Sequence, residues 1–240
     1  MTQDDLFLAA QTTNPLEQTI ARVTGAIKTR LLSPGERLPA ERDLAVQLGV
    51  SRSTLRVGLQ TLTEAGWIEV RRGRHGGSFV ARWPCMPHPR KLPEVLERHR
   101  EDLPALLDYR RAVEGTAAAL AAERATPDEI DELAAINHTL EENQENLEAY
   151  RTADARFHIG VARAAHSPRI MQAVTEIHSS LSEVLDVVIY QTTDMLVDAV
   201  AHHQKIIEAM RKSDYERAQQ VMLEHVRVVE DVIYSLVEAS

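Results

Sequence analysis

The stretch LGVSRSTLRVGLQTLTEAG (residues 48–66) decides the fold of the first part of the chain. Ser51 stands where a helix N-cap is expected, and Gly66 stands where a helix would end. Apolar residues recur at the spacing of one helical face, namely Val50, Leu55, Leu59 and Leu62. The stretch therefore predicts a short amphipathic helix with one buried face.

Two arginines give this helix an unusual exposed face. Arg52 and Arg56 lie four positions apart, so their side chains stand next to each other, opposite the leucines. Like charges at this spacing destabilise an isolated helix by about 0.2–0.5 kcal/mol. Such a pair suits phosphates and base edges better than a purely structural role, and we interpret the segment as a DNA-recognition helix.

The flanking segments complete a winged helix-turn-helix. Residues 15–32 and 39–49 carry apolar residues at helical spacing and are separated by a Ser-Pro-Gly break. Residues 67–71 and 78–81 flank the loop RGRHGG, which predicts a β-hairpin. In this fold the recognition helix enters the major groove, and the hairpin reaches the backbone or the minor groove.

Charge divides the chain in the same way. The 240 residues carry 27 Lys and Arg against 36 Asp and Glu, a net charge of −9. Residues 1–82 hold 11 basic and 8 acidic residues (net +3), and residues 83–240 hold 16 and 28 (net −12). An acidic body limits non-specific attachment to nucleic acid, so we expect the mildly basic N-terminal part to contact DNA.

Composition also bounds the fold class and the compartment. Aromatic residues make up only 4% of the chain while Ala, Leu and Glu are abundant, which favours helices. Cys85 is the only cysteine, so no intrachain disulfide can form. No apolar run approaches the roughly 18 residues that span a bilayer, and the acidic start lacks the features of a secretory signal. We expect a cytoplasmic protein without membrane association.

The remainder of the chain is predicted to be all-helical. Residues 83–103 contain four prolines and are predicted to be a linker, with a short helix over 94–100. Residues 104–240 show helical periodicity throughout, with five breaks that predict about six helices and no strand. The expected fold is mainly α: a winged helix-turn-helix domain (1–82), the linker, and an all-helical effector-binding and dimerisation domain.

Four polar residues interrupt the apolar faces of the predicted C-terminal helices. Asp154 and His158 share one face, and helical phase places His203 (rather than His202) and His225 on the buried faces of two later helices. Burying these groups unpaired would be costly, and a divalent transition metal would satisfy all four. Taken singly, each histidine is more simply explained as a hydrogen-bonded core residue, and Asp154 with His158 as an i,i+4 pair.

Arg110 is a further polar residue on an apolar face. It could form a salt bridge with Glu114, four residues on, or clamp an anionic ligand through its guanidinium group. We expect a role in ligand binding, with His178 and Tyr190 as further residues that could reach the same cavity.

The N-terminal residues carry a family resemblance. PGERLPAERDLAVQLGVSRSTLR (34–56), followed by LTEAGWIEVRRGRHGGSFV (62–80), resembles the DNA-binding domain of the GntR family of bacterial transcription regulators. The resemblance implies DNA contacts from the second and third helices and the wing, at Arg42, Ser51, Arg52, Ser53, Thr54, Arg56, Arg74, His75 and Gly76. Two positions depart from the family pattern: Ala40 replaces a frequent capping Ser, and Gly58 lies inside the recognition helix. Each change costs about 1 kcal/mol of helix stability.

The C-terminal residues resemble the all-helical ligand-sensing (FCD) domain of the FadR-type branch of that family. The resemblance is carried by DYRRAVEGTAAALAAERAT (108–126), DARFHIGVARAAHSP (154–168), HHQKIIEAM (202–210) and MLEHV (222–226). The metal-binding members share an Asp four residues before a His, and a His in each of two later helices. That pattern falls on Asp154, His158, His203 and His225, and it implies a bound ion: zinc, or alternatively nickel, manganese or iron.

These expectations combine into one function. The chain should be a homodimeric transcription regulator, in particular a repressor, which binds an inverted-repeat operator in double-stranded DNA. A small carboxylate effector, held by the metal and Arg110, should modulate operator binding. His166, which replaces Gly in a Gly-Asn-Pro pattern of the family, should line the cavity or cap a helix end.

Three alternatives remain open from the sequence. The metal could be purely structural, or the effector could be an acyl-CoA as in metal-free relatives. A metal-dependent enzyme is the third alternative. It is less favoured, because no buried general base beside the four ligands is apparent and the winged domain would have no role.

Overall fold

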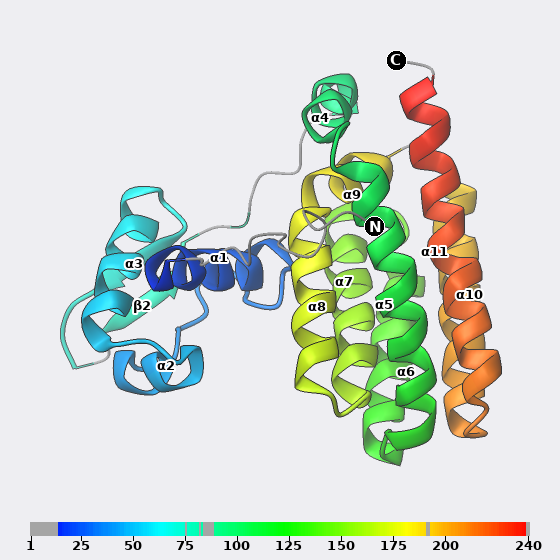
Figure 1. Cartoon of the computed structure of the whole chain (residues 1–240), viewed down its shortest axis with the longest axis horizontal. Coiled ribbons are helices and arrows are strands. Elements are labelled where there is room, and N and C mark those ends of the chain that lie inside the picture. Colours follow the sequence, from blue (N-terminus) through cyan, green and yellow to red (C-terminus); the bar gives the residue numbers. More distant parts are fainter. Residues whose placement is uncertain (1–13, 75, 82, 84–88, 191–192, 239–240) are drawn as a thin grey trace, which may run out of the picture. The chain divides into compact units, whose positions relative to one another are not determined.

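The computed structural model describes residues 14–74, 76–81, 83, 89–190 and 193–238. The chain divides into two units, each with its own hydrophobic core (Figure 1). One unit combines the chain up to Ile27 with Leu32–Trp83. The other combines Lys28–Leu31 with Pro84–Ser240.

The first unit is a winged helix-turn-helix. Its elements are α1 (Pro15–Lys28), α2 (Glu41–Leu48), α3 (Arg52–Glu64), β1 (Ile68–Arg71) and β2 (Gly77–Val80). The two strands are antiparallel, and their register runs from Ile68 opposite Val80 to Arg71 opposite Gly77. The predicted order of helices followed by a hairpin is confirmed, although α1 ends at Lys28 rather than at Leu32.

Local signals in the sequence fix the ends of α2 and α3. Ser51 caps α3, because its Oγ accepts a hydrogen bond from the backbone N–H of Thr54 at 3.0 Å. Gly49 ends α2 with a φ of 68°, in the left-handed region that favours glycine. Ala40, at the start of α2, makes no side-chain capping bond, as its apolar side chain dictates.

Gly58 lies where α3 crosses α1. A Cβ atom at this position would lie 3.0 Å from Cγ2 of Thr19, which is tighter than ordinary side-chain contact. Thr19 is itself buried, and its hydroxyl donates a hydrogen bond to the carbonyl of Pro15 at 2.7 Å. The glycine inside the recognition helix therefore allows two helices to approach closely, which accounts for its departure from helix-forming residues.

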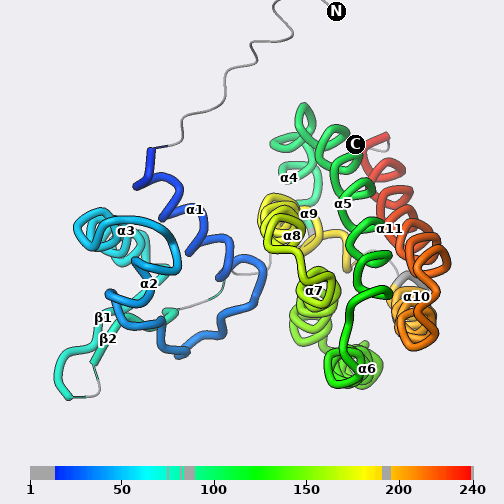
Figure 2. The backbone as a smooth tube through the Cα atoms, turned by 60° about the horizontal axis from the view of Figure 1, so that its bottom comes forward, coloured from blue at the N-terminus to red at the C-terminus, as the bar shows by residue number. Residues whose placement is uncertain are grey.

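The second unit is an all-helical bundle. After a 3-10 turn (Pro89–Lys91) its helices are α4 (Leu92–His99), α5 (Leu103–Arg124), α6 (Pro127–Glu142), α7 (Leu147–Ala164), α8 (Pro168–Ser180), α9 (Ser182–Val188), α10 (Thr193–Arg211) and α11 (Tyr215–Glu238). The long helices run alongside one another around a shared apolar core (Figures 1 and 2). Within the described part of the chain, none of the helices combines the length and apolarity needed to cross a bilayer.

Two expectations for this unit differ from the structure. The short helix predicted within the linker is present as α4, but its Val95 and Leu96 are buried in the core of the bundle, so this helix is part of the second unit. Arg98 on the same helix also pairs with Glu183 on α9, at 2.6 Å between Nη1 and Oε2. The second difference, among the described residues, is one helix more than the six or so expected after residue 103, because the helical stretch that begins at Pro168 is interrupted at Leu181, which separates α8 from α9 without a glycine or proline to signal the break.

Candidate metal centre and DNA interface

Three histidines from three helices meet inside the bundle. His158 on α7, His203 on α10 and His225 on α11 are all buried, with at most 2% of each residue exposed. The Nε2 atom of His225 lies 3.1 Å from Nε2 of His158 and 3.3 Å from Nε2 of His203. Two ligand atoms bound to one tetrahedral zinc ion at about 2.05 Å are about 3.3 Å apart, so this spacing fits a shared ion.

Asp154 adds an oxygen to the three nitrogens. It lies one helical turn before His158, and its Oδ1 is 3.8 Å from Nε2 of His158 and 4.0 Å from Nε2 of His203. The four ligand atoms lie within 4.8 Å of one another. One carboxylate with three imidazoles is a donor set suited to zinc, nickel, manganese or iron, so the residues present fit such an ion.

Burial keeps the imidazoles in the form that binds metal. Burial, followed by repulsion from His225 and His158, holds the pKa of His203 well below its usual range. Burial, followed by the charges of His158 and Arg110, does the same to the pKa of His225. Both rings are therefore neutral at pH 7, and a neutral ring has a lone pair to offer an ion.

Glu114 on α5 contacts the side of the His158 ring that faces away from the other ligands, and so orients that ring. This role was not predicted from the sequence. One oxygen of Glu114 accepts a hydrogen bond from Nδ1 of His158, and the other lies 2.8 Å from Nε of Arg110 and 3.1 Å from Nε2 of His178. A proton on Nδ1 of His158 leaves Nε2 free to face the ion, as in other carboxylate–histidine–metal arrangements. The only sequence signal was the i,i+4 spacing between Glu114 and Arg110.

The charge state of Glu114 follows from these contacts. Burial alone would raise the pKa of this carboxyl, but the charges of His158 and Arg110 outweigh burial and hold it well below its usual range. Glu114, His158 and His178 also lie close enough to one another to suggest a second metal site. We interpret them as a hydrogen-bonded network instead, because the guanidinium of Arg110 already supplies the cation next to Glu114.

A small cavity opens beside the metal ligands. It has a volume of about 40 Å³, and its polar lining comes from Arg110, Arg151, Asp154 and His225 together with Tyr150. Arg110 forms the salt bridge to Glu114 that was one of its two predicted roles, and its buried Nη1 has no hydrogen-bond partner among the described residues, so its role in ligand binding stays a prediction. A guanidinium beside an N/O metal set can orient a small carboxylate.

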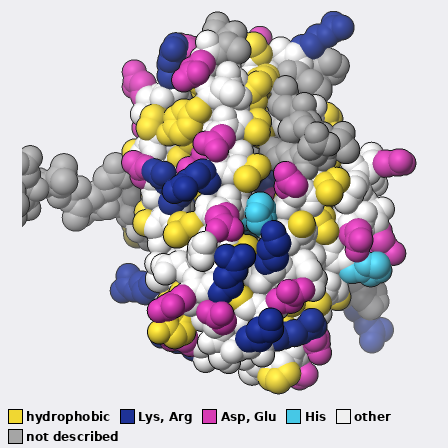
Figure 3. All heavy atoms as spheres, turned by 90° about the vertical axis from the view of Figure 1, so that its right-hand side faces the viewer, with side chains coloured by type: hydrophobic (Ala, Val, Ile, Leu, Met, Phe, Trp, Pro, Cys, Tyr) yellow, Lys and Arg dark blue, Asp and Glu magenta, His cyan; other side chains and the backbone are white. Residues whose placement is uncertain are grey.

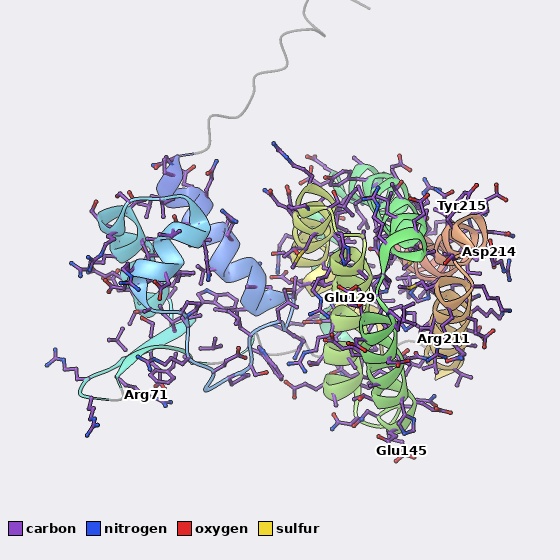
Figure 4. All side chains as sticks on the ribbon, turned by 90° about the horizontal axis from the view of Figure 1, so that it is seen from below. Arg71, Glu129, Glu145, Arg211, Asp214 and Tyr215 are labelled. Atoms are coloured by element: carbon purple, nitrogen blue, oxygen red, sulfur yellow. The ribbon has the colours of Figure 1, made fainter. Side chains whose placement is uncertain are left out.

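The other predicted ligand-binding residues lie elsewhere. His178 is buried next to Glu114 and does not line the cavity. His166 follows the end of α7, two turns past His158, where its Nε2 lies 3.0 Å from both carboxylate oxygens of Glu129 (labelled in Figure 4). Tyr190 follows α9 and is 37% exposed. Neither His166 nor Tyr190 lines the cavity, so their expected place in it is corrected.

The predicted DNA-contacting side chains lie mostly on the surface of the first unit. Arg52, Ser53 and Arg56 are exposed on α3, and Arg56 pairs with Glu41 of α2 at 2.7 Å. Thr54 is partly exposed, and Ser51 serves as the cap described above. An exposed guanidinium held by one carboxylate keeps further donors for phosphates or bases.

The remaining predicted contacts belong to α2 and the wing. Arg42 is exposed and pairs with its neighbour Asp43 at 3.0 Å. Arg74 is exposed near the tip of the hairpin, Gly76 is buried in its turn, and His75 lies outside the described residues. Arg71 extends from the hairpin, with its guanidinium 4.2 Å from the ring centre of Phe79 (Figure 4).

Comparison with known proteins gives matches along most of the chain. Residues 15–80 match the model of bacterial regulatory proteins of the gntR family, and residues 105–228 match the FCD domain. The HTH-type transcriptional regulator named RmpR of Mycobacterium gastri is 35% identical over 87% of this chain and 76% of its own. A protein of Escherichia coli K12, named as an L-lactate dehydrogenase operon regulatory protein, is 31% identical over 87% and 82%.

A solved structure shows the same fold. It is that of McbR/YncC of Escherichia coli, which aligns with 93% of this chain and 99% of its own at a TM-score of 0.52 and 19% sequence identity. At this identity the likeness concerns the fold alone.

Proposed function

Because the chain belongs to the GntR family of DNA-binding transcription regulators and carries an FCD domain, we propose that it is a metal-dependent, effector-responsive repressor. It acts as a homodimer on an inverted-repeat operator, since the two-fold symmetry of a dimer is mirrored in its DNA site. The family models and the relatives are those of regulators rather than enzymes.

The convergence of His158, His203, His225 and Asp154 is the observation that carries the metal proposal. Its support is the spacing of 3.1 and 3.3 Å between Nε2 atoms, with every ring buried. We assign zinc to this site, with nickel, manganese and iron as the other candidates. When bound, a divalent ion supplies a coordination position that a carboxylate oxygen can occupy.

The effector is a small carboxylic acid. The cavity of about 40 Å³ is far smaller than the roughly 300–1,000 Å³ of pockets that hold drug-sized ligands, which argues against an acyl-CoA. The guanidinium groups of Arg110 and Arg151 line the cavity, and a bound divalent ion would add positive charge, which favours an acid. One relative is named for the L-lactate dehydrogenase operon, and lactate is a small carboxylic acid.

DNA binding belongs to the exposed arginines of α3 and to the wing. The helical unit is a poor competitor for DNA, because acidic and basic side chains intermingle over its α10 and α11 face (Figure 3). Arg52 and Arg56 read the major groove, with Ser51, Ser53, Thr54 and Arg42 contributing backbone or base contacts. Arg74, His75 and Gly76 of the wing reach the backbone or the minor groove.

Metal content and operator affinity, measured on the purified full chain, test the proposal. Elemental analysis should give close to one transition metal per chain. His203→Ala combined with His225→Ala should remove the ion, whereas His202→Ala should retain it, because His202 is only half-buried and is not part of the ligand group. Loss of the ion from the His202 variant alone would overturn the ligand assignment.

Operator affinity is then measured on a DNA site selected in vitro with the same protein. L-lactate, as the first of a panel of small acids, should change the dissociation constant of the zinc-loaded protein and leave the chelated protein unaffected. An acid response that survives chelation would contradict a sensory metal. Arg52→Ala should weaken operator binding by about 1–3 kcal/mol, while the exposed control Lys212→Ala should not.

A further inference from the structure

Arg151 is a buried arginine next to the candidate metal ligands, and its N–H groups are incompletely satisfied by the described residues. It lies on α7, one turn before Asp154, and only 2% of it is exposed. Its guanidinium lines the same cavity as Arg110. Among the described residues, none accepts a well-formed hydrogen bond from Nε, Nη1 or Nη2 of Arg151. A guanidinium carries five N–H donors, so this side chain is available to an anion in the cavity.

The carboxylates around Arg151 do not fully offset its charge. Asp186 on α9 lies 3.1 Å from Nε, but a second buried arginine, Arg30, shares this carboxylate at 3.6 Å. Arg30 also lies 3.4 Å from Glu148, whose side chain is 58% exposed and therefore screened by water. Two buried guanidinium groups thus share the carboxylate of Asp186. Asp154 also lies 3.8 Å from Nη1 of Arg151, but its carboxylate belongs to the candidate ligand group, so a bound ion would compete for it.

A second excess of positive charge arises at the metal ligands. The ligand group supplies one negative charge, from Asp154, toward a divalent ion. Glu114 does not reduce this excess, because the charge of Arg110 is already paired with it. The cavity is lined by Arg151 and by two of the candidate ligands, Asp154 and His225, so with an ion bound it would have incompletely offset positive charge both at the ligand group and at Arg151.

From this arrangement we propose that Arg151 is a second anion-binding residue and that the effector is a short dicarboxylate. One carboxylate faces the ion and Arg110, and the other pairs with Arg151. When Arg151 turns to the ligand, Asp186 keeps its ion pair with Arg30. The movement of Arg151 therefore leaves no buried carboxylate without a cationic partner. This inference rests on the proposed function, in that it assumes a carboxylate-binding cavity beside the ion.

Calorimetry on the zinc-loaded full chain tests the inference with malonate and propionate, two three-carbon acids that differ in the second carboxylate. Wild-type protein should bind malonate at least tenfold more tightly than propionate. Arg151→Met should reduce malonate affinity at least tenfold and change propionate affinity less than threefold. Arg110→Met should weaken both acids. The control Arg156→Met, an exposed position on the same helix, should change neither.

The zinc content of each variant reports whether its site is intact, and Arg151→Lys serves as a second variant that keeps the charge but loses the planar fork. It should bind malonate with an affinity between those of wild type and Arg151→Met. Equal affinity of wild-type protein for the two acids would overturn the inference, as would malonate binding that is unchanged in both Arg151 variants. Binding of neither acid to the wild-type protein would overturn the proposed carboxylate site itself.

Discussion

Glu114 is not one of the four candidate metal ligands, but it holds one of them, His158, in position. Its carboxylate contacts His158, His178 and Arg110, and it therefore fixes which nitrogen of His158 faces the ion. Glu114→Gln keeps the shape but removes the charge, so it weakens the hold on His158 and leaves Arg110 unpaired. Zinc affinity, measured by competition with a chromophoric chelator, should fall about 10–100-fold.

A matched control for this substitution is Glu129→Gln. Glu129 also pairs with a histidine, His166, but it does so at the surface and away from the ligands. Zinc affinity of that variant should equal that of wild type. If Glu114→Gln retained full affinity, the orienting role of Glu114 would be disproved.

Individual residues show where sequence reasoning reached its limit. Helical phase distinguished His203 from His202 correctly, because the period of a helix fixes which residues share a face. It could not place Glu114 behind His158, since these residues are 44 positions apart and periodicity says nothing of which helices meet. His166 and Tyr190 failed for the same reason: their distance from the cavity depends on tertiary packing.

At the level of elements, the crossing of α1 and α3 sets the position of the recognition helix. Gly58→Ala should gain helix propensity of up to about 1 kcal/mol but crowd Cγ2 of Thr19, which lies 3.0 Å from the new Cβ atom. We expect a net loss of stability, because Thr19 is buried and held by its bond to Pro15. Urea denaturation measures this change.

Thr19→Ser provides the companion variant, since it keeps the hydroxyl and removes the crowding methyl group. In the Thr19→Ser background, Gly58→Ala should lower the free energy of unfolding less than it does in wild type, or raise it. The difference between the two backgrounds is the coupling energy of a double-mutant cycle. Additive effects of the two substitutions would show that the helices are not in close contact at this point.

Element boundaries were predictable where residues with strong local preferences mark them. Ser51 and Gly49 stand at the ends of predicted helices, and the structure retains both ends. The break at Leu181 could not be foreseen, because Leu181 itself keeps a helical φ of −82° and no glycine or proline stands nearby. The helix α4 was predicted as a short helix within a linker, but the surrounding prolines obscured the fact that its Val95 and Leu96 belong to the core.

For the whole molecule, the buried histidines predict a pH dependence of folding. Burial lowers the pKa of His178 to about 4, whereas an unfolded chain titrates histidine near 6.5. Between these values the unfolded state binds more protons, so the stability of the metal-free protein is lost as pH falls from about 6.5 to about 4. The loss approaches about 1.4 kcal/mol per pH unit for this group.

His203 and His225 act in the same direction, because burial also lowers their pKa. Urea denaturation of chelated protein should therefore give a smaller free energy of unfolding at pH 5.5 than at pH 7.5. The exposed His138 offers a control: His138→Gln should leave the difference between the two pH values unchanged. Equal stability at both pH values would contradict burial of neutral histidines.

The nearly complete enclosure of the three imidazoles also has a kinetic consequence. Asp154 is the least buried of the four ligands, with 17% of its side chain exposed, so an ion must pass beside it or wait for the helices to part. Metal exchange should then follow the slow opening of the bundle rather than diffusion. Each molecule would keep the ion that it acquired on folding, so the metal content of the protein would reflect the metal supply at the time of synthesis. Occupancy by the small acid would follow the current concentration of that acid.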